Sequence, residues 1–239
     1  MGVGRELGNR DPASPELLSV AGQAAPSSLL PALVGAGSII HCRSGHMLLA
    51  AGSRSVDVYV ILTGRLRVTI FSADGREVII RDLSAGQMFG DLAAVDGGRR
   101  SASVVALDEC RLLLVPDVAF RAATFAEADR AAWFAGHLAA QIRMLTERLI
   151  ELTTLNVRSR LHCQLLRLCV IAGVIGNQAL IDPAPSHEEL ADMIGTHREA
   201  ITRELSYLAT TGILEAGRRR LVVRDVAELG SMVRKAQGS

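Results

Sequence analysis

The pattern of apolar and polar positions changes along the chain, and each change predicts a different kind of element. Between residues 38 and 116, short apolar runs of β-type composition alternate with glycine turns. From about 126 to 155, apolar residues recur at helical spacing. The last third carries two short helical patterns and then an apolar hairpin pattern. The sequence therefore predicts an α+β chain in which a β domain, a long helix and a small helical domain follow one another.

Four runs in the first region have the composition of strands, and they cover residues 56–62, 65–71, 77–83 and 104–115. Thr63-Gly64 and Ala73-Asp74-Gly75 are turn signals between neighbouring runs. Short strands at this spacing are typical of a compact antiparallel roll, barrel or sandwich, which we expect over residues 31–125. Residues 1–30 are rich in Gly, Pro, Ala and Ser and predict a flexible arm, with a short helix near 31–34.

The long helix, expected within residues 126–157, carries its apolar residues in alternating steps of four and three. These residues are Ala131, Ala135, Leu138, Ile142, Leu145, Leu149 and Leu152. The spacing is the a/d pattern of a coiled coil, which packs against one partner helix. Packing onto the chain's own β domain is the alternative. We prefer a homodimer whose seam runs from Leu138 to Leu152.

The stretch that begins at Ser186 predicts two short helices joined by a turn at Gly195. Ser186 and Thr196 each precede a glutamate by three residues (Glu189 and Glu199), which is the capping-box spacing. Glycine suits the left-handed residue that ends a helix. The apolar residues that would share a core are Leu190, Ile194, Ile201 and Leu205.

Polar residues gather near the amino end of the second of these helices. They are Thr196, His197, Arg198, Glu199, Thr202 and Arg203. A helix-turn-helix reads base edges from this position, because the amino end of its second helix enters the major groove. An ordinary antiparallel helix pair with a solvated polar face is the alternative.

The segments around this helix pair complete a winged helix-turn-helix domain, expected over residues 158–239. A further helix is predicted over 161–175, followed by a turn at Gly176-Asn177. After Gly212, a β-hairpin is predicted to turn near 216–218. Its arginines, well placed to bind phosphates beside the groove, are Arg218, Arg219 and Arg220.

Composition limits the classes of protein that fit this organisation. The 239 residues suit two domains, and 49% apolar residues exclude wholesale disorder. With a formal net charge of +1, only a local patch can bind nucleic acid. No apolar run suits a membrane span and no signal peptide is evident, so we expect a cytoplasmic protein. Four cysteines without CxxC spacing predict buried free thiols and no metal, namely Cys42, Cys110, Cys163 and Cys169.

A turn-rich excursion between two strands suggests a ligand pocket. A short helical turn after Gly90 would aim backbone N–H groups at an anion. Arg100 would bind that anion with two parallel hydrogen bonds, and Ser101 would add a hydroxyl. Asp91 would accept a hydrogen bond from a sugar hydroxyl. The pattern predicts a phosphate-and-ribose pocket, with ordinary loop charges as the alternative.

Phe89-Gly90-Asp91-Leu92-Ala93, followed by Arg100-Ser101-Ala102, resembles the phosphate-binding cassette of cyclic-nucleotide-binding domains. With the long helix and the winged helix, the chain resembles the CRP/FNR family of bacterial transcription regulators over about residues 35–225. The resemblance implies that Arg100 pairs with the cyclic phosphate and that Ser101 hydrogen-bonds it. It also implies that Asp91 contacts the ribose 2′-hydroxyl, while Gly90 and the Leu92–Ala93 backbone shape the turn.

The resemblance further implies an effector, most simply cAMP. Family members that bind cAMP read the adenine with two adjacent hydroxyl residues, and Leu145 and Thr146 stand at those positions here. Thr146 fits and would reach a partner's ligand, whereas Leu145 removes one contact. Asp91 is one methylene shorter than the family's glutamate, so its ribose contact would be longer or bridged by water. These departures leave cGMP possible, with Ser101 offering it a hydroxyl.

On the second helix of the pair, Arg198, Glu199 and Arg203 match the family's base-reading trio. The arginines suit guanine and the glutamate suits cytosine, although Glu199 would also serve as a capping residue. The resemblance implies palindromic TGTGA-type sites in double-stranded DNA, with RNA polymerase as a partner.

Three other functions stay open at this point. A regulator of the same family would bind DNA without a cyclic nucleotide or sense another small ligand. An enzyme is disfavoured because the sequence has no convergent His and carboxylate set, no GxSxG and no metal spacing. A scaffold protein is disfavoured because it would not need the arginine-rich faces of the second helix and the hairpin. An iron–sulfur sensor is disfavoured because the chain has no cysteine before Cys42. A haem sensor is disfavoured because His41, His46 and His137 are expected to be surface or capping residues rather than haem ligands.

Overall fold

The computed structural model describes residues 19–20, 23–72, 75 and 77–238. The chain divides into two compact units, one made of residues 1–71 and 80–143 and the other of residues 72–79 and 144–239. Most of the predicted arm lies outside the described residues. In its described part, β1 (Ser19–Val20) and β2 (Gln23–Ala24) pair in antiparallel fashion. The short helix predicted near 31–34 lies within α1 (Leu29–Ala36).

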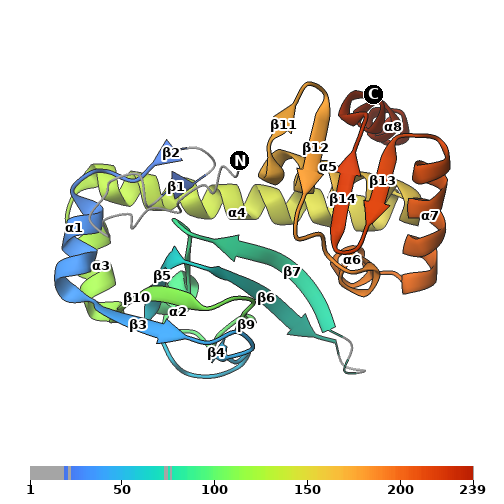
Figure 1. Ribbon diagram of the computed structural model, residues 1–239. Helices are drawn as coiled ribbons and strands as arrows, with labels where there is room; N and C mark the ends of the chain where they lie inside the picture. Colours follow the sequence, from blue (N-terminus) through green and yellow to red (C-terminus); the bar gives the residue numbers. More distant parts are fainter. Residues whose placement is uncertain (1–18, 21–22, 73–74, 76, 239) are drawn as a thin grey trace, which may run out of the picture. The chain divides into compact units, whose positions relative to one another are not determined.

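The first unit is built on two antiparallel sheets of four strands each (Figure 1). The first sheet has the order β3-β10-β5-β8, with β3 (Ser38–Cys42), β10 (Cys110–Val115), β5 (Val58–Thr63) and β8 (Met88–Phe89). The second has the order β4-β9-β6-β7, with β4 (Met47–Leu49), β9 (Ser103–Ala106), β6 (Arg65–Phe71) and β7 (Glu77–Ser84). The predicted strands and the antiparallel β-roll are therefore present.

One detail of the strand prediction was wrong. The run over 104–115 is not one strand, because the chain turns between β9 and β10, which lie in different sheets. At this turn Asp108 accepts hydrogen bonds from Arg65 Nε and Nη2 at 2.7 and 3.1 Å. The predicted turn at Gly64 is present between β5 and β6, and it joins strands of different sheets.

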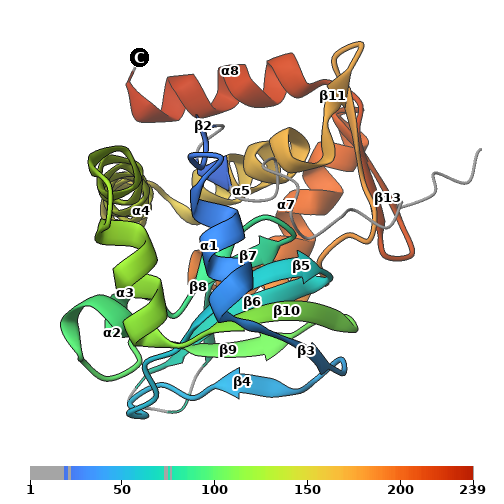
Figure 2. The same ribbon diagram turned by 90° about the vertical axis from the view of Figure 1, so that its left-hand side faces the viewer.

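Strand β5 explains how one apolar run serves two cores. Val58, Val60 and Leu62 pack on the side of the helices, while Tyr59 and Ile61 pack among the strands. Alternate residues of a strand point to opposite faces, so a strand covered on both faces is apolar throughout. Figure 2 shows α1 and α3 (Asp117–Phe125) beside this sheet, and their core also contains Trp133 and Phe134 of α4 (Ala128–Thr154).

Helix α4 confirms the long helix predicted over 126–155. Most of the predicted seam is open to solvent in the single chain, with Ile142 65% and Leu149 61% exposed and with Leu145 and Leu152 about half exposed. Leu138 differs, because it is half-buried against the helix-side core of its own domain. The exposed part of the seam leaves an apolar stripe available to a partner helix.

The second unit contains a bundle of helices and one antiparallel sheet with the order β11-β12-β14-β13. Its elements are α5 (Val157–Ala172), β11 (Val174–Ile175), β12 (Gln178–Ile181), α6 (His187–Ile194), α7 (Arg198–Thr210), β13 (Leu214–Gly217), β14 (Arg220–Val223) and α8 (Val226–Gln237). The four core residues predicted for the helix pair are all buried, which confirms their shared core. Helix α8, which packs on α5, was not predicted.

Both boundaries of the helix predicted over 161–175 were wrong. It begins at Val157, because the side chain of Asn156 caps it by accepting a 3.0 Å hydrogen bond from the N–H of Ser159. It ends at Ala172, where Gly173 has a φ of 89°. Val174 and Ile175 then form a strand, and the predicted turn at Gly176-Asn177 joins it to β12.

All four cysteines are buried thiols, as predicted. Burial raises the pKa of the Cys110 and Cys169 thiols to about 11. In the described ranges, no group of three His, Cys, Asp or Glu side chains is placed to hold a metal ion. No helix of the described part has the length and apolar character that crossing a bilayer requires.

Candidate functional site

The predicted ligand cassette lies where β8 ends and α2 (Asp91–Asp96) begins. Gly90 joins them with a φ of 83°, in the left-handed region. A Cβ at this position would lie 2.7 Å from Nη1 of Arg100 and 2.7 Å from the carbonyl oxygen of Asp57. Only glycine therefore allows the turn and the arginine to approach each other this closely.

Arg100 is buried beneath the turn, and its guanidinium is clamped by the protein. Its Nε donates to Oγ of Ser55 at 2.9 Å, and Nη1 and Nη2 donate to the carbonyl oxygens of Gly90 and Asp57, each at 2.7 Å. Burial lowers the pKa of Arg100, and the negative charges of Asp57 and Asp91 oppose that shift. The site thus fixes a cation next to the N-terminal end of the α2 turn.

The side chain of Asp91 is buried and points to α4. Its Oδ2 lies 3.0 Å from Nε2 of His137 and accepts a 3.3 Å hydrogen bond from Nε2 of Gln141. Gln141 Oε1 in turn accepts a 3.1 Å hydrogen bond from Nη2 of Arg81, on β7. The expectation that His137 is a surface or capping residue was wrong, because its ring is buried and pairs with a carboxylate.

Sequence reasoning missed the roles of His137 and Gln141, although one signal was available. The two residues lie four apart on a helix whose apolar seam was already predicted, so they share a face. Their partner Asp91 is 46 residues from His137 in the sequence, and only the fold brings it close. His41 and His46 are exposed, as expected.

The other predicted ligand residues differ in exposure. Ser101 and Leu92 are exposed, whereas Ala93 is buried under the α2 turn. Leu145 and Thr146 are exposed on α4. Their contact with a ligand stays a prediction.

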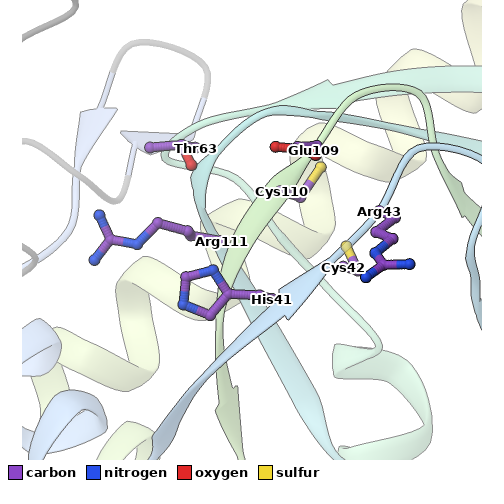
Figure 3. A pocket seen from close by; sticks show the side chains of 7 residues that line it. All are labelled: His41, Cys42, Arg43, Thr63, Glu109, Cys110 and Arg111. Carbon is purple, nitrogen blue, oxygen red and sulfur yellow. The ribbon is translucent and has the colours of Figure 1, made fainter.

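A separate surface pocket of about 570 Å³ opens between β3, β5 and β10 (Figure 3). Its lining is formed by His41, Cys42, Arg43, Thr63, Glu109, Cys110 and Arg111. Cys42 and Cys110 face each other there because their strands place them in register. None of these residues belongs to the predicted cassette.

The second candidate site is the helix pair of α6 and α7. The N–H of Glu189 donates to Oγ of Ser186 at 3.2 Å, and Oε2 of Glu189 accepts from the N–H of Ser186 at 2.7 Å. This reciprocal arrangement confirms the first capping box. Gly195 has a φ of 64°, which confirms the left-handed residue predicted at the turn.

The capping box predicted at Thr196 was wrong by one residue. His197, not Thr196, is the N-cap of α7, and its side chain makes no capping hydrogen bond. The turn after Gly195 requires one more residue than the spacing suggested. Glu199 is therefore the second residue of α7, and its side chain is exposed rather than in a capping-box position.

The amino end of α7 presents most of the predicted base-reading residues to solvent. His197, Arg198, Glu199, Thr202 and Arg203 are exposed, whereas Thr196 is buried. Thr202 also ties the two helices together, because its Oγ1 lies 2.8 Å from Nδ1 of His187 at the start of α6.

The predicted wing is the hairpin of β13 and β14. Gly217 pairs with Arg220, so the turn residues are Arg218 and Arg219, slightly later than predicted. Arg219 has a φ of 54°, and all three arginines are exposed. The wing thus carries three exposed positive charges at and beside its turn.

Two arginines from outside the helix pair hold its turn. Arg160 of α5 donates from Nε to the carbonyl oxygen of Ile194 at 3.0 Å, and Arg148 of α4 donates from Nη1 to that of Met193 at 3.1 Å. Cations at a helix C-terminus satisfy its last carbonyl groups and complement the helix dipole. Burial lowers the pKa of Arg148 to about 10, with the nearby charge of Arg167 adding to the effect.

Two domain families match the chain in the order of these two sites. The cyclic nucleotide-binding domain family matches residues 39–126, and the Crp-like helix-turn-helix domain family matches residues 159–232. The cyclic AMP receptor protein of Thermus thermophilus is 32% identical over 189 residues, which cover 77% of this chain and 83% of that protein. The chain belongs to the CRP/FNR family of transcription regulators.

Another relative of this CRP/FNR regulator is the CRP-like cAMP-activated global transcriptional regulator of Mycobacterium tuberculosis. It is 26% identical over 222 residues, which cover 92% of this chain and 99% of that protein. The structure of FixK2 from Bradyrhizobium japonicum matches with a TM-score of 0.71 at 22% identity, covering 82% of this chain and 96% of that one, and it supports the fold. The protein is thus a DNA-binding transcription regulator with a cyclic-nucleotide-binding domain, and not an enzyme.

Proposed function

We propose that this regulator is a homodimer switched by cAMP, and that it binds palindromic TGTGA-like sites in DNA. The observation that carries the proposal is that one chain holds a buried arginine clamped beneath a left-handed turn and an exposed arginine-rich face on α7. A protein that bound only a nucleotide would need only the clamped arginine, and a protein that bound only DNA would need only the arginine-rich face of α7.

On the ligand side, Arg100 is the anchor for the cyclic phosphate. Three protein acceptors hold its guanidinium in place, and the remaining N–H groups are available for two charge-assisted hydrogen bonds. Ser101 adds a hydroxyl and Asp91 takes the ribose. The relatives from Thermus thermophilus and Mycobacterium tuberculosis are both named for cyclic AMP, which favours cAMP over cGMP as the effector.

On the DNA side, Arg198 and Arg203 would read guanine, and Glu199 would read cytosine. The exposed arginines of the wing would bind phosphates beside the groove and so fix the register of α7. We assign DNA contacts to His197, Thr202 and the buried Thr196 as well.

The exposed stripe of α4 supports the homodimer. The a/d face contains Ile142, Leu145, Leu149 and Leu152, each about half exposed or more in the single chain. A two-fold dimer would place two copies of α7 on successive major-groove turns, which explains a palindromic site.

Ligand would switch the protein only by binding one arrangement of the dimer more tightly than the other. Acting on DNA, the protein would work in the cytoplasm, with RNA polymerase as its partner.

A second candidate is a regulator of the same family that binds DNA without cyclic nucleotide or with another ligand. The observation in its favour is that Oδ2 of Asp91 already contacts His137 and Gln141. Leu145 also offers no hydroxyl to an adenine.

Fluorescence anisotropy of a labelled palindromic TGTGA duplex, titrated with the protein at fixed salt, tests the proposal. The titration is run without nucleotide, with cAMP and with cGMP, and a duplex with scrambled half-sites is the control. Tight binding of the specific duplex only with cAMP is the expected result. Equal binding under all three conditions would favour the second candidate. Equal affinity for both duplexes would overturn the site assignment.

A further inference from the structure

Two side chains of α4, one buried and one half-buried, meet at one oxygen of Asp91 in the ligand cassette. Oδ2 of Asp91 lies 3.0 Å from Nε2 of His137 and 3.3 Å from Nε2 of Gln141. Asp91 is 4% exposed and His137 is 6% exposed, so solvent does not compete for these contacts. Nε2 of Gln141 also lies 2.6 Å from Nε2 of His137, so the two side chains contact each other as well as Asp91. Both contacts from α4 thus converge on one oxygen of the carboxylate.

We propose that His137 and Gln141 are positioning residues that make the cassette selective for a ribose 2′-hydroxyl. They fix Asp91 through Oδ2 and leave Oδ1 as the acceptor for the sugar. This inference rests on the proposed cyclic-nucleotide site and adds the residues that decide its sugar selectivity. The bond from the sugar hydroxyl to Oδ1 is charge-assisted, and such a bond is strong only when the acceptor is held in place.

The surroundings of the pair restrain its movement. The ring of His137 stacks near Trp133 and Phe134, with centroid distances of 6.1 and 5.9 Å. Gln141 is held from its other end by Arg81, which donates to Oε1 at 3.1 Å. Burial lowers the pKa of Arg81, and the charge of Asp91 opposes that shift. The carboxylate is thus held by two side chains that are themselves held by their neighbours.

The length of the Asp91 side chain makes this support necessary. An aspartate has a shorter reach than a glutamate, and a displacement of about 1 Å in a binding group is enough to weaken a directional contact strongly. If His137 and Gln141 release Oδ2, the carboxylate is free to rotate and Oδ1 loses its direction. The ligand would then keep its phosphate contact with Arg100 but lose discrimination at the sugar.

Isothermal titration of cAMP and of 2′-deoxy-cAMP, the same molecule without the hydroxyl, tests this directly. The variants are His137→Phe, which keeps an aromatic ring beside Trp133, and Gln141→Met, which keeps the length of the side chain. We expect the wild type to bind cAMP at least about tenfold more tightly than 2′-deoxy-cAMP, the effect of one such hydrogen bond. Each variant should lose most of that ratio, while its affinity for 2′-deoxy-cAMP changes by less than about threefold.

The controls separate positioning from simple loss of structure. His137→Gln supplies an N–H donor and should restore part of the ratio, whereas His46→Ala, at an exposed histidine of the same unit, should leave it unchanged. If His137→Phe does not fold, as judged by circular dichroism, the half-buried Gln141 decides the question. An equal loss for both ligands, or an unchanged ratio, overturns the inference. Wild-type binding without sugar preference does the same, while no binding of either ligand overturns the proposed function itself.

Discussion

Nε2 of His162 on α5 lies 2.8 Å from Oε1 of Glu204 on α7, and both side chains are buried. Oε2 of the same carboxylate pairs with Nε of Arg158 at 3.0 Å. Helix α7 is therefore anchored to α5 through the carboxylate of Glu204. Because the anchor is polar and directional, it also fixes the rotation of α7 about its own axis, which an apolar contact alone would leave looser.

Glu204→Ala should destabilise the winged-helix domain by about 1–3 kcal/mol, because it leaves the buried ring nitrogen of His162 without its hydrogen-bond partner. Differential scanning calorimetry of the full chain measures the shift in the transition of that domain. Glu188→Ala, at an exposed glutamate of α6, is the matched control and should change little. Similar shifts for both variants would show that the His162 contact does not anchor the helix.

Arg100→Ala should abolish cyclic-nucleotide binding, because it removes the only cation clamped beneath Gly90 among the residues that the structure describes. Calorimetric titration with cAMP measures the loss, and circular dichroism checks that the domain remains folded. The neighbouring Arg99→Ala is the control, since Arg99 is exposed and donates to the carbonyl oxygen of Gly52 instead. Unchanged affinity in the Arg100 variant would refute the pocket assignment.

Arg203→Ala should cost roughly 1–3 kcal/mol on the best DNA site and relax the preference at one base pair. Anisotropy titrations against a set of duplexes, each altered at one position, give both numbers. Arg218→Ala on the wing provides the contrast: it should weaken all duplexes alike and reduce the slope of log K against log salt by about 1. If Arg203→Ala behaves like the wing variant, Arg203 contacts a phosphate rather than a base.

If the protein forms the proposed dimer, Leu149→Asp should convert it to a monomer, because the substitution places a charge in the middle of the α4 seam. Its side chain is 61% exposed in the single chain, so the fold of the monomer should survive. Sedimentation velocity reports the change in mass. Ile171→Asp, at an exposed apolar residue of α5, is the control for a new surface charge. A dimeric Leu149 variant would show that the seam packs elsewhere.

The cysteines should react slowly in the native protein. Burial raises the pKa of Cys110 and Cys169 to about 11, so at about pH 8 their reactive thiolate is rarer than that of a free cysteine. Labelling with a thiol reagent should accelerate as the pH rises toward 11 and should reach all four residues at once in urea. Since the fold favours the neutral thiols, stability should fall over the same rise in pH. Rapid native labelling at about pH 8 would contradict the burial of these side chains.

The sequence by itself determined the elements whose signals are local. The capping box of Ser186 and Glu189, the left-handed Gly195 and the a/d spacing of α4 depend on residues within a few positions of one another. The β runs were equally readable, because each strand carries its own alternation of faces. These signals were enough to predict the order of β domain, long helix and helix pair, whereas the cassette was predicted from its resemblance to cyclic-nucleotide-binding domains.

Tertiary structure alone decided what depends on residues that are distant in the sequence. The separation of β5 from β6 and of β9 from β10 into two sheets follows from the closure of the roll, which no single strand encodes. Likewise, the partners of Asp91 come from α4, 46 and 50 residues away. The start of α7 moved by one residue because the geometry of the turn, rather than capping preference, set it. Local conformational preferences of a few tenths to about 1 kcal/mol per residue decide which segments form helices and strands. Burial of apolar side chains in a shared core contributes more free energy, and it decides which of these elements pack together.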